Sequence, residues 1–201
     1  MHPVALELAM SGSREQRVVY LARPCQYESR RAPACESSVW THRRYSLENL
    51  QLMNAALDSL KQDADQLLLY GYSGGGVMAA LLAATRDDVL GFVTMAANLD
   101  TQAWTIYHAV SPLLGSMNPV DFAGELAGVP QVHFVGGKDE TVPRQVVASY
   151  FEHLGISKTG RWVLKPDFDH GCCWSSAWPA LYGEAMSLLE QQIIAFGETN
   201  R

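Results

Sequence analysis

The stretch LLLYGYSGGGVMAALLAA, residues 67–84, constrains the fold more than any other part of the chain. An apolar run breaks at Gly71, and small apolar residues resume after three consecutive glycines. A buried strand followed at once by a closely packed helix is typical of this pattern. Ser73 lies at the break, where it is either a nucleophile on a sharp turn or part of a phosphate-binding bend.

The rest of the chain alternates between helical and strand patterns in the same way. Ser46 is placed to cap the helix that follows it. Strands separated by helices pair in parallel, with helices on both faces of the sheet, so we expect an α/β fold. The expected helices cover residues 2–10, 47–60, 76–85, 142–155 and 178–196, and the expected strands cover 16–22, 66–71, 89–97, 130–137 and 161–166.

Length and composition limit the classes of function. We expect a single domain over residues 1–201, in which 98–128 form a small lid or insertion, because 201 residues that are 48% hydrophobic suffice for one core. A net charge of −6 argues against nucleic acid as a partner. Charges, glycines or serines interrupt every apolar stretch before the roughly 20 residues of a bilayer span, and no leader follows Met1.

Reactive residues follow three of the expected strands. GYSGG fits the G-x-S-x-G pattern, in which Gly71 and Gly75 permit the turn that exposes Ser73. The N–H of Gly74 then faces the site of a developing oxyanion. Asp139 lies in KDETVP and His170 in DHGCCW. The order Ser, Asp, His, each after its own strand, is typical of nucleophilic acyl transfer on such a sheet.

These motifs, with YLARPCQY, NLD, SPLLGSMNP and HFVGGKDETVP, resemble the α/β-hydrolase family, and in particular a bacterial, often exported or lipid-anchored, subgroup. The resemblance implies Ser73 as nucleophile, His170 as general base and then acid, and Asp139 as the carboxylate that orients it. It implies an acyl-enzyme, no cofactor, and a small-molecule or lipid ester as substrate.

One departure from the family concerns the second oxyanion donor, which family members take from the turn after an additional strand. Either QRVVYLARP is that strand, with Ala22 or Arg23 supplying the N–H, or the strand lay upstream and is absent. We expect that this strand is absent, because the helix after Pro3 resembles the crossover that would follow such a strand. An export signal would have been lost together with that strand. We therefore expect a periplasmic location or one anchored on the outer side of the membrane, with a cytoplasmic location as the alternative.

Other interpretations of the site residues remain open. GGGVMA also fits a dinucleotide-binding loop, although the next strand ends in TMAAN and not in a ribose-binding acid. A non-catalytic binding module with this fold is a further alternative. Asp139 could instead cap a helix, with Glu140 or Asp100 as the acid. Metal binding by His170 and the adjacent cysteines is disfavoured, because no fourth ligand is spaced nearby.

Substrate contacts and cysteine pairing are less constrained. Tyr72, Trp104, His108 and Trp174 are the candidates for contact with substrate, although aromatic residues such as Trp104, Trp174 and Trp178 are more often core. Four cysteines allow three pairings. Cys25 and Cys35 bracket a short polar loop whose closure would suit an exported protein, and free thiols are the alternative.

Overall fold

A computed structural model describes residues 3–11, 17–27, 35–61, 66–155 and 160–199. Its strands are β1 Leu67–Tyr72, β2 Val89–Met95, β3 Gln131–Gly136 and β4 Gly160–Lys165. Its helices are α1 Val4–Met10, α2 Leu47–Leu60, α3 Gly74–Thr85, α4 Thr101–Tyr107, α5 Ala123–Leu126, α6 Arg144–Leu154 and α7 Trp174–Thr199, with 3₁₀ turns η1 Ser37–Trp40 and η2 Pro119–Phe122.

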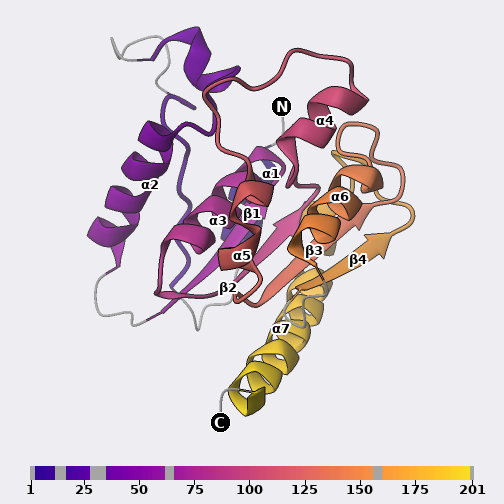
Figure 1. Ribbon diagram of the computed structural model, residues 1–201. Coiled ribbons are helices and arrows are strands. Elements are labelled where there is room, and N and C mark those ends of the chain that lie inside the picture. The colour runs from indigo at the N-terminus through magenta and orange to yellow at the C-terminus, as the bar shows by residue number, and fades with distance from the viewer. Residues whose placement is uncertain (1–2, 12–16, 28–34, 62–65, 156–159, 200–201) are drawn as a thin grey trace.

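The four strands form one parallel sheet in the order β1-β2-β3-β4 (Figure 1). Each strand is followed by a helix that carries the chain back to the start of the next, as a parallel connection requires. The carboxyl ends of all four strands therefore meet at one edge, and the loops that follow them lie together. The predicted α/β class is confirmed.

Helices cover both faces of this sheet because the strand residues alternate between them. In β2, Val93 and Met95 pack with α1 and α7, whereas Phe92 packs on the opposite face with α3, α5 and α6. β3 is buried along its whole length, as expected for a strand covered on both sides. The C-terminal end of α7 projects beyond the sheet (Figure 1).

The second helix is anchored to its neighbour by a cap and an apolar stripe. Ser46 Oγ accepts a hydrogen bond from the N–H of Asn49 at 3.3 Å, so the predicted N-cap is confirmed. Leu50 and Met53 are buried and pack against α3. This contact fixes the residues just before α2, which lie beside the start of α3.

The strand expected over residues 16–22 is wrong for the described part of that range. Residues 17–23 have no regular structure, and Val18 and Val19 are nearly half exposed. β-branched residues favour strands only where a neighbouring strand accepts their hydrogen bonds, and no described strand pairs with this segment. Gln16 lies outside the described residues.

Other boundaries also differ from expectation. α3 begins directly after Ser73, two residues before the expected start, and α7 begins at Trp174, four residues early. Residues 98–128, expected to form a small lid or insertion, contain two short helices and a 3₁₀ turn (α4, η2, α5). None of the described helices has both the length and the apolarity needed to cross a bilayer.

Candidate active site

Ser73 lies at a strained turn between β1 and α3, with φ 51° and ψ −124°. This conformation is rare for residues other than glycine, and it aims the side chain away from the sheet. A Cβ on Gly71 would stand 2.5 Å from the carbonyl oxygen of Gly75, and one on Gly76 would stand 2.4 Å from Cβ of Ala97. The turn therefore requires glycine at these two positions.

The predicted reason for Gly75 is wrong. A Cβ at this position would have no atom within 4 Å, so the turn itself does not require a glycine there. The close approach expected of Gly75 is made instead by Gly76, one residue later in the first turn of α3. Its backbone packs directly on the residues that follow β2.

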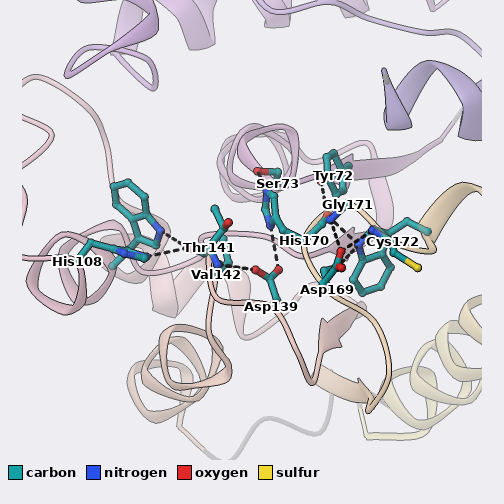
Figure 2. Close-up of polar contacts among 12 residues, drawn as sticks. Tyr72, Ser73, His108, Asp139, Thr141, Val142, Asp169, His170, Gly171 and Cys172 are labelled. Carbon is teal, nitrogen blue, oxygen red and sulfur yellow. Dashed lines mark hydrogen bonds and ion pairs between the residues drawn. The ribbon is translucent and has the colours of Figure 1, made fainter. Parts of the chain in front are cut away.

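Three predicted residues form one hydrogen-bonded chain (Figure 2). Ser73 Oγ lies 3.1 Å from Nε2 of His170, and Nδ1 of His170 lies 2.9 Å from Oδ2 of Asp139. A proton on Nδ1 is held by the carboxylate, which leaves the Nε2 lone pair for the hydroxyl of Ser73. The geometry suits removal of the proton from Ser73 by His170.

Main-chain groups fix the orientation of Asp139. Its side chain is fully buried, and Oδ1 accepts hydrogen bonds from the N–H groups of Thr141 at 2.9 Å and Val142 at 2.7 Å. Oδ2 is thereby left to His170. The rival Glu140 is exposed to solvent. Asp139 thus combines the cap-like role of the alternative interpretation with contact to the imidazole.

Asp100, the other rival acid, belongs to a different network. Its carboxylate caps α4 by accepting from the N–H groups of Gln102 and Ala103, each at 3.0 Å, and from Ser149 Oγ at 2.6 Å. Burial works against the charged form, but these bonds prevail and hold the pKa of Asp100 below its ordinary value. Asp100 is therefore a structural carboxylate.

The loop that carries His170 is held by its backbone carbonyls. Trp174 Nε1 donates to the carbonyls of Asp169 at 3.0 Å and His170 at 3.1 Å, and the hydroxyl of Tyr72 donates to the carbonyl of His170. Asp169 Oδ1 closes the loop by accepting from the N–H of Gly171 at 2.8 Å and of Cys172 at 2.7 Å. The imidazole is thus positioned by its neighbours in sequence as well as by Asp139.

Tyr72 remains a hydrogen-bond donor at any ordinary pH. Burial, together with the negative charges of Asp139 and Asp169, raises its pKa to about 12. Tyr72 is also the last residue of β1 and lies directly before Ser73. The same short stretch of backbone therefore presents Ser73 and holds the His170 loop.

Two glycines allow the Asp139 and His170 loops to touch. A Cβ on Gly136 would stand 2.7 Å from the carbonyl oxygen of Phe168, and one on Gly137 would stand 2.5 Å from that of Pro166. The N–H of Lys138 donates to the Phe168 carbonyl at 2.9 Å. Contact between the two loops brings the carboxylate within reach of the imidazole.

The aromatic residues proposed to contact substrate are placed differently from one another. Trp104 Nε1 at 2.6 Å and His108 Nε2 at 2.9 Å both lie on the carbonyl of Thr141, next to the Asp139 turn (Figure 2). Trp174 is completely buried under the His170 loop, and Trp178 is 4% exposed in the core. The expectation that Trp174 contacts substrate is therefore wrong, because its indole is used to hold that loop.

QRVVYLARP, the segment considered as a source of the second oxyanion N–H, forms no strand over its described residues 17–24. The N–H of Arg23 donates to Oε1 of Gln26 at 3.1 Å, which leaves Ala22 as the remaining backbone candidate in that segment. The side chain of Arg23 instead reaches Gly74: a Cβ on Gly74 would stand 2.8 Å from the Tyr45 hydroxyl and 3.1 Å from Nη1 of Arg23.

Cys25 and Cys35 form a disulfide, and the adjacent Cys172 and Cys173 lie side by side in HGCCW. Within the described residues, His, Cys, Asp and Glu side chains form no group suited to a metal ion.

Sequence reasoning missed several residues of this site. The N–H groups of Thr141 and Val142 and the hydroxyl of Tyr45 carry no motif of their own. Asp169 had a signal, since an Asp two residues before a glycine is typical of a side chain that caps its own turn.

Comparisons with known proteins concern the fold. No protein-family model matches the sequence, and a search of curated proteins finds no match. Among solved structures, an esterase from Pyrococcus furiosus is 13% identical with a TM-score of 0.58, over 74% of this chain and 63% of the other. An esterase domain from Rhodothermus marinus is 20% identical with a TM-score of 0.51, over 76% and 70%.

A puromycin hydrolase is 19% identical with a TM-score of 0.54, over 72% of this chain and 24% of its own. This chain thus spans about a quarter of that hydrolase and less than two thirds of the Pyrococcus esterase. An α/β hydrolase from a Penicillium species, 12% identical with a TM-score of 0.57, shares the arrangement over 77% of this chain and 73% of its own. The parallel sheet, its crossovers and these likenesses together show that the chain has the α/β-hydrolase fold.

Proposed function

We propose that the protein is a serine hydrolase that cleaves a carboxylic ester, or a related acyl bond, through an acyl-enzyme. The observation that carries this proposal is the continuous chain from Ser73 Oγ through His170 to the buried carboxylate of Asp139. The solved structures with this fold include esterases and a puromycin hydrolase, which supports hydrolysis of an acyl bond.

The mechanism follows from the positions of the three side chains. Ser73 Oγ attacks the carbonyl carbon while its proton passes to Nε2 of His170, and the electron pair of the C=O bond moves onto oxygen. The N–H of Gly74 and the N-terminus of α3 lie beside the attacking atom, where they stabilise this oxyanion. The intermediate expels the alcohol, which takes the proton from Nε2.

Water then releases the acid by the same steps. His170 removes a proton from water, the hydroxide attacks the acyl carbon, and the ester bond to Ser73 breaks as Oγ recovers the proton. Asp139 stabilises the imidazolium in both halves without taking up the proton itself. The main-chain bonds to Oδ1 keep that carboxylate in place.

Labelling with a fluorophosphonate probe tests the nucleophile directly. We expect Ser73 to be labelled, and labelling to be lost in Ser73→Ala and strongly reduced in His170→Ala. Hydrolysis of 4-nitrophenyl butyrate should fall roughly 10⁶-fold in Ser73→Ala, because these residues act as a unit. Ser59→Ala, which changes an exposed serine of α2, is the matched control and should behave as wild type.

One observation favours a second candidate, a binding module with little catalysis. The backbone N–H of Arg23 is already bound to Gln26, and loss of one oxyanion donor costs about 3 kcal/mol in transition-state stabilisation. A folded protein whose Ser73 resists the probe would support the module. Labelling that depends on His170 would support the enzyme.

We further propose that the protein works in an oxidising compartment. The disulfide between Cys25 and Cys35 closes a loop of the kind that persists in exported proteins. Alkylation of free thiols in the exported protein is expected to leave Cys25 and Cys35 unmodified, because the disulfide protects both. Free, alkylatable Cys25 and Cys35 in the native compartment would favour a cytoplasmic location.

A further inference from the structure

A pocket lies between residues 23–26 and the segment that runs from η1 to the start of α2. It has a volume of about 280 Å³, and its lining includes Arg23, Val39, Trp40, Arg44 and Asn49. Volumes of this size hold small organic groups. The pocket combines two guanidinium groups with an apolar wall, which is a distinctive lining in a chain of net charge −6.

Arg23 connects this pocket to the active site. It lines the pocket, and its Nη1 lies 3.1 Å from the position that a Cβ on Gly74 would occupy. Gly74 directly follows the nucleophile and begins α3. A substrate whose carbonyl lies at Ser73 can therefore extend past Gly74 toward the guanidinium of Arg23.

Tyr45 shows that the two arginines act on the same place. Burial raises the pKa of its hydroxyl, while the positive charges of Arg23 and Arg44 oppose that rise. The same hydroxyl lies beside Gly74. Both guanidinium groups thus act on one buried hydroxyl, which lies beside Gly74.

Among the described residues, the two arginines of the pocket have no carboxylate partner. Across the described ranges, neither Arg23 nor Arg44 forms an ion pair with a carboxylate, whereas the adjacent Arg43 pairs with Glu48 at 3.1 Å. Arg44 is held by a bond from Nε to the carbonyl of Thr41 at 2.6 Å. Half-buried guanidinium groups without a counter-ion favour an anionic ligand, and their planar fork fits a carboxylate.

We propose that this pocket binds a carboxylate carried by the substrate, at Arg23 and Arg44, with Trp40 and Val39 covering the apolar chain between that carboxylate and the scissile bond. The preferred substrate is then an acidic ester, such as a half-ester of a dicarboxylic acid. That the bound molecule is a substrate rests on the proposed function, whereas binding of a carboxylate in this pocket does not.

Binding is measured on Ser73→Ala protein by calorimetry, with monomethyl adipate as the probe and neutral dimethyl adipate as its match. We expect the half-ester to bind at least about tenfold more tightly than the diester, since a hydrogen bond to a charged group contributes this much. In the same background Arg23→Gln and Arg44→Gln should each weaken binding about tenfold or more. Arg161→Gln, an exposed arginine on β4, should leave it unchanged.

Equal binding of the two adipate esters would overturn the proposal, as would tighter binding of inorganic phosphate than of the half-ester. A melting curve on each variant separates loss of the site from loss of the fold, and Arg44→Gln provides a second test if Arg23→Gln does not fold.

Turnover by the intact enzyme provides an independent readout. The ratio of kcat/KM for mono-4-nitrophenyl adipate to that for 4-nitrophenyl hexanoate is expected to fall about tenfold in Arg23→Gln and to stay constant in Arg161→Gln. An unchanged ratio in Arg23→Gln contradicts the pocket. Inactivity on both esters, with half-ester binding retained in Ser73→Ala, would instead refute the hydrolase.

Discussion

The two sides of Ser73 are built in different ways. On one side, the loops after β3 and β4 are joined by main-chain hydrogen bonds, and both carboxylate oxygens of Asp139 have partners. On the other side, residues 17–23 form no strand, and the long side chain of Arg23 lies beside Gly74. The disulfide Cys25–Cys35 and the contact of α2 with α3 hold that side.

This difference matches the demands of the two tasks. Proton transfer between Ser73 and His170 requires positions accurate to a fraction of an ångström, which backbone contacts supply. Selection of a substrate requires charge and shape, which side chains of a pocket supply. We therefore expect changes on the first side to affect the rate of the chemical step, and changes on the second side to affect stability of the loop and choice of substrate.

The largest expected effect concerns Asp139. Asp139→Asn removes the charge that holds Nδ1–H of His170, so kcat on 4-nitrophenyl butyrate should fall about 10⁴-fold with little change in stability. The control is Asp100→Asn, which weakens the cap of α4 and lowers the melting temperature while kcat stays near wild type. A larger loss of kcat in Asp100→Asn than in Asp139→Asn would reverse the assignment of the acid.

The turn at Ser73, which both sides share, is tested by adding one methyl group. In Gly71→Ala the new Cβ would stand about 2.5 Å from backbone atoms of residues 75–76, which is a severe clash. The free energy of unfolding should therefore fall by about 3 kcal/mol or more. Gly75→Ala meets nothing and should be neutral or stabilising by up to about 1 kcal/mol. Urea denaturation measures both variants, and equal losses would contradict this view of the turn.

Removal of the Cys25–Cys35 disulfide tests only the side of Ser73 on which Arg23 lies. In the double variant Cys25→Ser, Cys35→Ser, loss of a cross-link between residues 10 apart should lower unfolding free energy by about 2–3 kcal/mol. Affinity for monomethyl adipate should fall more than the rate at which a fluorophosphonate labels Ser73, because Cys25 borders the pocket. A greater loss in labelling than in affinity would show that the two sides are not separable.

A pH-dependent effect on stability is expected from a buried histidine of β3. His133 lies between Thr94 Oγ1 at 2.8 Å and Gln131 Oε1 at 2.9 Å, and burial lowers its pKa from 6.5 to about 3. Between these values the unfolded chain binds a proton that the folded chain does not. Stability should therefore fall as pH falls below 6.5, by up to about 1.4 kcal/mol per pH unit.

Urea denaturation at several pH values is expected to show a shallower dependence in His133→Gln than in wild type. His153→Gln, which changes an exposed histidine of α6, serves as the control. Parallel curves for His133→Gln and wild type between pH 6.5 and 4 would contradict the role given to His133.

The first side of the site is largely predictable from the sequence. The strands β1, β2 and β3 are short and largely apolar, β4 ends just before Pro166, and Ser73, Asp139 and His170 each follow one of the four strands. Parallel strands bring such residues to a common edge, so local patterns were sufficient. The cap at Ser46 was equally local.

The second side was not predictable in the same way. Val18 and Val19 have strand propensity, but whether a segment pairs depends on a neighbour that propensity does not describe. The approach of Arg23 and Tyr45 to Gly74 depends on how α2 packs on α3, a contact between distant parts of the chain. Likewise, no sequence pattern indicates that the indole of Trp174 donates hydrogen bonds to backbone carbonyls of the His170 loop.

The hydrogen bond from Tyr72 to the carbonyl of His170 has a consequence for how the protein fails on heating. Because Ser73 directly follows Tyr72, the last residue of β1, His170 cannot drift away from Ser73 while that strand stays paired with β2. Partial fraying of α1 or of the end of α7 leaves this unit intact. Heat inactivation should accordingly follow the same curve as the cooperative melting of the sheet, with no inactive but folded species beforehand.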